Sequence, residues 1–250
     1  MKKVILIATG VIALMAVAIA LIRASATRPS TLSGVAVTEP GYTQKLLAGV
    51  KASFTTGKTE IQRSFDAKKN AKSYRMKIVL RLHPGHPLET LIEVSCPDRE
   101  RFTTTIGDRA FHAVRIANKA YVEQQDGTWT VQDTPPSGWS PCGENPGEPA
   151  PWAVMNEGRE QVTLLARMSE NADIARGAFV GTSSGNCQQW MVNLKLPGSA
   201  GQRHGNNGLR YTVCIEPNQH LPVAVSMGSG GMVTSYSDWN QPIQIEAPPM

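Results

Sequence analysis

The chain has 250 residues, enough for one sizeable domain or two small ones, and its 41% hydrophobic content is ordinary for a globular protein. The formal net charge is +5, but Lys2, Lys3 and Arg23 supply three of the positive charges near the N-terminus, which leaves +2 for the remainder. No cluster of Lys and Arg is interleaved with aromatic residues, so the composition argues against a nucleic-acid partner.

Residues 1–26 are predicted to be a membrane-targeting segment. Lys2 and Lys3 form a basic start, residues 4–22 carry no charge, and Ala24-Ser25-Ala26 suits signal-peptide cleavage. The apolar run is long for a signal peptide and short for a transmembrane helix, so a cleaved signal peptide and an uncleaved membrane anchor both remain open. Either alternative predicts that residues 27–250 are extracytoplasmic, in a periplasm, and either soluble or tethered to the inner membrane.

Residues 27–40 contain several Thr, Ser and Pro residues and are expected to be a linker to a single domain over 41–250. A short amphipathic helix is expected next, because Leu46, Leu47, Val50 and Phe54 recur at near-helical spacing.

From residue 73 the hydrophobic period changes to two, which is typical of half-buried strands. Residues 73–82 and 88–95 are expected to pair as a hairpin, and 110–132 contains two further turns, one at Asp126-Gly127. Residues 134–151 hold six prolines and predict a long loop that leads to a second helix over 152–168. Strands then resume at 177–183, 186–196, 208–216, 221–227, 232–237 and 243–247.

The order of these elements predicts an α+β fold. Strands joined by short turns pair antiparallel, so the sheet should be large and antiparallel, with one apolar face. That face must be buried, and the two expected helices can cover at least part of it.

The four cysteines are even in number and lack C-x-x-C spacing, which in an exported chain favours disulfides over zinc. Placing Cys187 opposite Cys214 pairs Trp190 with Tyr211 on the other face of the hairpin, an arrangement that cross-strand packing favours. We therefore expect a Cys187–Cys214 bond, with two free thiols as the alternative. Cys96 and Cys142 then pair by elimination.

No short motif predicts a catalytic, metal or cofactor site. "GTSSG" at 181–185 fits the pattern around a hydrolase nucleophile, with Ser183 at its centre, but a strand follows where the motif requires a helix. His83 and His86 lie in a turn without a nearby third ligand. The chain is therefore expected not to be an enzyme.

The last residues alternate: Ile243 and Ile245 share one face, while Gln244 and Glu246 share the other, which predicts a closing strand. The stretch from Thr234 to Pro248, with Tyr236, Asp238 and Trp239, resembles the C-terminal segment of the LolA-like periplasmic lipoprotein and lipid carriers, including the mycobacterial lipid-binding lipoproteins. "EVSCPDRERF" at 93–102, "ANKAYVEQQDGTW" at 117–129 and "YTVCIEPNQHLPV" at 211–223 are also similar to strand-and-turn segments of that family.

The resemblance implies a sheet curved into an unclosed half-barrel, with helices over an apolar concave face that holds acyl chains. Each methylene group transferred from water contributes about 0.8 kcal/mol, so apolar side chains alone could hold a lipid. The residues expected to line this face are Tyr74, Met76, Ile78, Leu80, Ile92, Trp190, Val192, Leu194, Leu209 and Tyr211. The alternative is that the helices fill the face completely.

Two functions follow from the resemblance. The first is a non-enzymatic binder or carrier of lipid acyl chains or of lipoproteins, and it needs no cofactor. The second is a membrane-anchored sensor or assembly subunit that uses the same fold to bind a protein partner, which could be an inner-membrane protein.

Overall fold

The computed structural model describes residues 30–81, 87–133, 142, 172–194 and 209–249. Within them it contains two helices, α2 (Tyr42–Ser53) and α3 (Gly57–Lys69), followed by eleven strands. The strands are β1 (Ser73–Leu80), β2 (Leu88–Ser95), β3 (Arg99–Ile106), β4 (Arg109–Ile116), β5 (Lys119–Glu123), β6 (Trp129–Asp133), β7 (Ala172–Thr182), β8 (Gly185–Leu194), β9 (Leu209–Ile215), β10 (Pro222–Met227) and β11 (Met232–Ser237).

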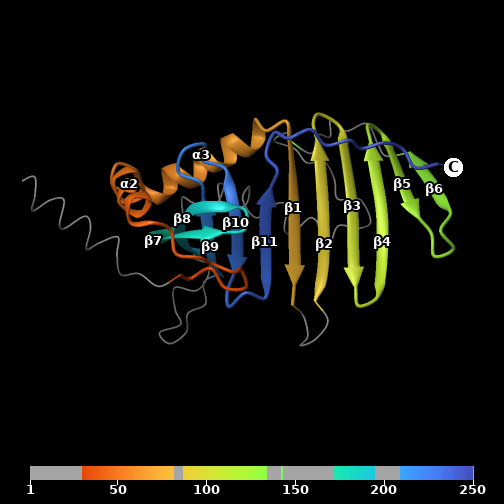
Figure 1. Ribbon diagram of the computed structural model, residues 1–250. Coiled ribbons are helices and arrows are strands. Elements are labelled where there is room, and N and C mark those ends of the chain that lie inside the picture. Colours follow the sequence, from red (N-terminus) through yellow and green to blue (C-terminus); the bar gives the residue numbers. More distant parts are fainter. Residues whose placement is uncertain (1–29, 82–86, 134–141, 143–171, 195–208, 250) are drawn as a thin grey trace, which may run out of the picture.

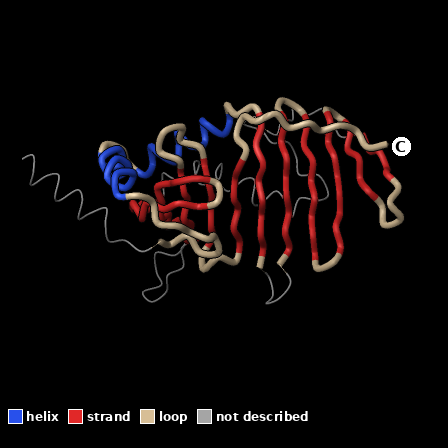
Figure 2. Tube along the Cα trace, viewed as in Figure 1, coloured by secondary structure: helices blue, strands red, loops and turns tan. Residues whose placement is uncertain are grey.

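All eleven strands form one antiparallel sheet in the order β6-β5-β4-β3-β2-β1-β11-β10-β9-β8-β7 (Figure 1). The first and last strands, β1 and β11, pair in its middle, from Arg75 opposite Ser237 to Leu80 opposite Met232. The sheet curves without closing, and both helices lie at its β7–β10 end (Figures 1 and 2). The predicted α+β half-barrel is confirmed.

The inner, concave face of the sheet carries the main hydrophobic core. Tyr74, Met76 and Ile92 on it are completely buried, and α3 adds Ile61 and Phe65 to the same cluster. Ile61 and Phe65 lie four residues apart and so share one side of α3. This helix was absent from the sequence prediction.

Helix α2 lies where the first helix was predicted, but of the four predicted apolar residues only Leu46 is half-buried and the other three are exposed. Its buried residues are Ala48, Gly49 and Ala52, whereas Leu47 is 63% exposed and Phe54, just after the helix, is 87% exposed. Small side chains let the helix approach β7 closely, and this contact determines which side faces the sheet. The predicted second helix, 152–168, lies outside the described residues.

Residues 30–38 pack on the outer face of the sheet, although they fall within the expected linker. Leu32 is buried in a cluster that includes Cys187 and Cys214. The backbone N–H of Thr31 donates to Gln189 Oε1 at 3.1 Å, and Thr38 exchanges two backbone hydrogen bonds with Gly181 of β7. These contacts cover part of the outer face and the free edge of β7.

Both predicted disulfides are present, Cys96–Cys142 and Cys187–Cys214. The predicted register of the second hairpin is wrong by two residues: Cys214 lies opposite Gln189, and Tyr211 lies opposite Val192. A shift of two keeps every side chain on its face, so the apolar face was predicted correctly while the pairs were not. The disulfide joins diagonal neighbours whose Cα atoms are 5.3 Å apart.

The predicted closing strand over 243–247 is absent. These residues run across the ends of the β1–β4 strands without joining the sheet (Figure 1). Ile243 and Ile245 are buried against Val114 on the outer face, and Arg99 Nη1 donates to the Ile245 carbonyl at 2.9 Å. The alternation therefore indicates a segment with one buried side, and not a strand.

The stretch just before it holds this segment to β1. Trp239 packs against both Tyr74 and Tyr236, with ring centroids 4.9 and 5.6 Å away. The backbone N–H of Asn240 donates to the Ser73 carbonyl at 2.9 Å. The segment that resembles the LolA-like carriers thus fixes the C-terminal chain to the centre of the sheet.

Candidate functional site

The structure brings most of the predicted ligand-contacting residues together, as a packed core. Eight of the ten are at most 5% exposed, and Leu80 is half-buried beside them. Leu209 lies apart, 39% exposed at the start of β9. The eight are Tyr74, Met76, Ile78, Ile92, Trp190, Val192, Leu194 and Tyr211. In this state the middle of the inner face is covered by the protein's own atoms.

Helix α3 begins in close contact with the inner face. A Cβ atom at Gly57 would lie 2.2 Å from Ile174 Cγ2 and 2.9 Å from Trp190 Cε3, so any larger residue would push the helix start away from the sheet. Thr56 caps the helix, because its side chain accepts a hydrogen bond from the Thr59 backbone N–H at 3.2 Å. The turn between α2 and α3 is thereby held just above Trp190.

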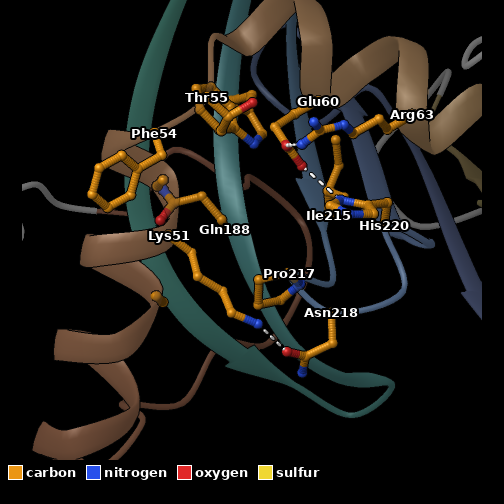
Figure 3. Close-up of a pocket in the computed structure, with 13 residues that line it drawn as sticks. Lys51, Phe54, Thr55, Glu60, Arg63, Gln188, Ile215, Pro217, Asn218 and His220 are labelled. Atoms are coloured by element: carbon orange, nitrogen blue, oxygen red, sulfur yellow. Dashed lines mark hydrogen bonds and ion pairs between the residues drawn. The ribbon is translucent and has the colours of Figure 1, made fainter.

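A pocket of about 400 Å³ opens beside this turn, between the two helices, β8, β9 and the β9–β10 turn (Figure 3). This volume is within the range of small-molecule sites. Apolar side chains form part of the lining, and Trp190 and Ile215 are the largest from the sheet. The lining residues are Ala48, Lys51, Ala52, Phe54, Thr55, Glu60, Arg63, Gln188, Trp190, Ile215, Pro217, Asn218 and His220.

One wall of the pocket is charged. Glu60 of α3 is 6% exposed, and its carboxylate binds Arg63 Nη1 and His220 Nδ1, each at 2.9 Å (Figure 3). His220 reaches it because the β9–β10 turn places this residue in the left-handed region, at φ 58°. The buried acid therefore has two partners and joins α3 to the turn.

On the other side of the pocket, Lys51 of α2 extends toward the β9–β10 turn (Figure 3). Its Nζ donates to the Asn218 side-chain oxygen, and the Asn218 amide donates to Glu216 Oε1 at 2.8 Å. The direct partner of the ammonium group is thus a neutral amide. The pocket thus combines the apolar Trp190 and Ile215 with two cationic side chains, Lys51, bound to a neutral amide, and Arg63, paired with Glu60.

Sequence reasoning found Trp190 but missed the other pocket residues. Most of them come from α2, the α2–α3 turn, α3 and the β9–β10 turn, and the sheet adds Gln188 of β8 and Ile215 of β9. The signals for α3 were Thr56 before the helix, Ile61 and Phe65 four residues apart, and Lys68 and Lys69 in the last turn.

The short motifs that did not predict a catalytic or metal site were Ser183 in "GTSSG" and the two histidines at 83 and 86. Ser183 lies in the turn between β7 and β8, as predicted. His83 and His86 lie outside the described residues. Within the described part of the chain no group of three or more His, Cys, Asp or Glu side chains could hold a metal ion, and no helix is long and apolar enough to cross a bilayer.

No protein-family model matches the chain, and no curated protein matches it by sequence. Among solved structures, LprF from Mycobacterium bovis is similar over 76% of this chain and 96% of its own, with 13% identity and a TM-score of 0.47.

Two further solved structures match at lower TM-scores. MucB, in its complex with MucA from Pseudomonas aeruginosa, matches 74% of this chain and 55% of its own at 12% identity, with a TM-score of 0.38. A LolA superfamily protein from Nitrosomonas europaea matches 76% of this chain and 96% of its own at 7% identity, with a TM-score of 0.28. One of the structures similar to this chain is therefore described as a LolA superfamily protein.

Proposed function

We propose that the protein is an extracytoplasmic, non-catalytic binding protein that holds an acyl chain in the pocket between α2, α3 and the sheet. The observation that carries this proposal is the pocket itself: about 400 Å³ of space with Trp190 and Ile215 on its floor and Lys51 and Arg63 at its rim. An acyl chain would contact the floor, and its carboxylate, phosphate or ester head would meet the cations.

Trp190 links this site to the inner face predicted from the sequence. It lines the pocket and belongs to the same hydrophobic cluster as Val192, Leu194 and Tyr211. We propose that the remaining predicted residues form the wall behind the ligand, and that a longer chain would have to separate α3 from them.

The two disulfides support the extracytoplasmic location, since such bonds form and persist in oxidising compartments. A free lipid and the acyl group of a lipoprotein would place the same kind of chain in the pocket. Selection between these two cargoes would therefore depend on contacts outside the pocket.

Asn218→Trp tests the pocket. Its side chain points across the opening to Lys51, so an indole at this position would occupy part of the space (Figure 3). We expect the full chain, purified after export, to bind a fluorescent fatty acid, and we expect Asn218→Trp to weaken that binding at least about tenfold, a loss of about 1.4 kcal/mol. Fluorescence polarisation of the fatty acid measures both.

Gln219→Trp is the matched control. Gln219 is the next residue of the same turn, is exposed, and does not line the pocket. Gln219→Trp adds the same aromatic group and should leave the affinity for the fluorescent fatty acid within about twofold of the parent. Failure of the parent to bind, or an equal loss in both variants, would remove the pocket as the acyl site.

Native mass spectrometry distinguishes the second candidate, a sensor or assembly subunit that binds a protein. This alternative is favoured by the burial of the middle of the inner face, which leaves the surface as the available contact. Acyl species that co-purify with the chain would support the carrier. An empty chain with a stoichiometric protein would support the subunit.

A further inference from the structure

We propose that the exposed side of α2 docks on a bilayer surface that carries anionic lipid headgroups. Leu47, Val50 and Phe54 follow one another at i, i+3 and i+7 and therefore lie on one side of the helix. They are 63%, 37% and 87% exposed. This side is defined here as the docking face; Phe54 at its end also lines the pocket, whereas Leu47 and Val50 do not.

The docking face lies opposite the side that contacts the sheet. The buried residues Ala48, Gly49 and Ala52 pack toward β7, and Ser53 Oγ donates back to the Gly49 carbonyl at 2.7 Å. A helix of a globular domain normally buries its large apolar residues. Here Leu47, Val50 and Phe54 face outward although the small residues are buried, and packing among the described residues does not explain their position.

The charges on α2 favour a membrane over another apolar protein surface. The helix contains Lys45 and Lys51 and no acidic residue. Lys45 pairs with Glu39, whereas Lys51, which borders the docking face, donates to the neutral amide of Asn218. Large apolar residues beside lysines are typical of helices that lie in the headgroup region, where apolar burial and attraction to anionic lipids act together.

The position of α2 in the chain supplies a second argument. Residues 4–22 form the uncharged apolar run, and residues 30–38 pack on the outer face of the sheet. If residues 4–22 anchor the protein, residues 23–29 can separate this anchor from the packed segment by at most about 25 Å. The domain would then stay close to the bilayer, within reach of a docking helix.

A depth-sensitive label tests the proposal on the full chain. All four native cysteines are in disulfides, so an added cysteine can be labelled alone. With vesicles of equal parts phosphatidylcholine and phosphatidylglycerol, an NBD label at Val50→Cys should shift to the blue and be quenched by brominated phosphatidylcholine. The same label at Gln244→Cys, which is exposed on the C-terminal segment, should not change. The comparison holds whether or not residues 1–26 remain attached.

A second experiment adds charges to the labelled Val50→Cys chain to test whether Leu47 and Phe54 contribute to membrane binding. Leu47→Glu with Phe54→Glu should lower the quenching at least about tenfold, while the urea unfolding midpoint changes little because both side chains are exposed. Gln132→Glu with Gln244→Glu adds the same two charges elsewhere and should keep the quenching. Three outcomes would overturn the proposal: an unquenched Val50 label, equal losses in the two pairs, or a blue shift that depends on protein concentration without vesicles, which would indicate a second copy of the chain.

Discussion

Glu93 on the outer face shows how a single residue connects three strands. Its side chain is only 8% exposed and lies between Arg75 of β1 and Arg101 of β3. Arg75 Nε donates to Glu93 Oε1 at 2.8 Å, and Arg101 donates to Oε2. Burial raises the pKa of Glu93, but the hydrogen bonds and charges of the two arginines outweigh it and hold the pKa below its ordinary value of 4.5.

Glu93→Gln is expected to destabilise the protein in a pH-dependent way. A lowered pKa means that the folded state favours the carboxylate, so this contribution is complete above the ordinary pKa and is lost as pH falls through the folded-state pKa. At pH 7 the variant should lose about 1–3 kcal/mol, toward the lower end because the arginines are near solvent. Urea unfolding between pH 7 and pH 3 should show the two proteins converging below about pH 4.5.

Glu89→Gln is the control at this scale. Glu89 pairs with Lys77 at 2.7 Å on the same two-strand hairpin, but both side chains are about half exposed. Glu89→Gln should lower the free energy of unfolding by less than about 1 kcal/mol at every pH. A Glu93→Gln variant with no greater pH dependence than Glu89→Gln would contradict the role given to the buried carboxylate.

At the scale of elements, the C-terminal segment is fixed by its two isoleucines. Ile245 is 1% exposed in the cluster with Val114, whereas its neighbour Gln244 is exposed. Ile245→Ala should lower the free energy of unfolding by about 2–5 kcal/mol, and Gln244→Ala should change it by less than about 0.5 kcal/mol. Urea unfolding of the two variants gives the comparison. Equal effects would mean that the segment does not pack as described.

The same segment shows what the sequence could and could not predict. Alternation at Ile243 and Ile245 correctly identified the buried residues, but period two reports burial on one side and carries no information about hydrogen-bond partners. Cys187 and Cys214 were paired correctly for a related reason: parity assigned both to one face. The register stayed wrong by two because Trp190 has an apolar neighbour in either register, Tyr211 or Val213.

The candidate site was less predictable than the sheet. Residues of α2 were read as a core-facing stripe because Leu47, Val50 and Phe54 are large and apolar, and nothing in their spacing says which side of a helix packs. The pocket also depends on Lys51, Glu60 and His220, which come from separate segments that meet only in the folded chain. The periodicity of a single sequence does not indicate which distant segments come into contact in the folded chain.

For the molecule as a whole, the two disulfides are expected to contribute strongly to the free energy of unfolding. Cys187–Cys214 closes a separation of 27 residues and Cys96–Cys142 one of 46, and loops of this size contribute about 3–4 kcal/mol each in the chain-entropy estimate. Reduction should therefore lower the urea midpoint strongly, and Cys187→Ser with Cys214→Ser should reproduce about half of the loss. A reduced protein with an unchanged midpoint would contradict this assignment.

The pairing of β1 with β11 has a consequence for the time course of folding. Strands β1 to β6 follow one another along the chain, so this half can assemble from local hairpins as soon as residue 133 has emerged. Its β1 side would then present unpaired backbone groups until β11 arrives about one hundred residues later, and such an edge can template aggregation. Contacts this distant in sequence also slow folding. The half-finished sheet is therefore the folding state most exposed to aggregation, and it is shortest-lived when the rest of the chain follows quickly.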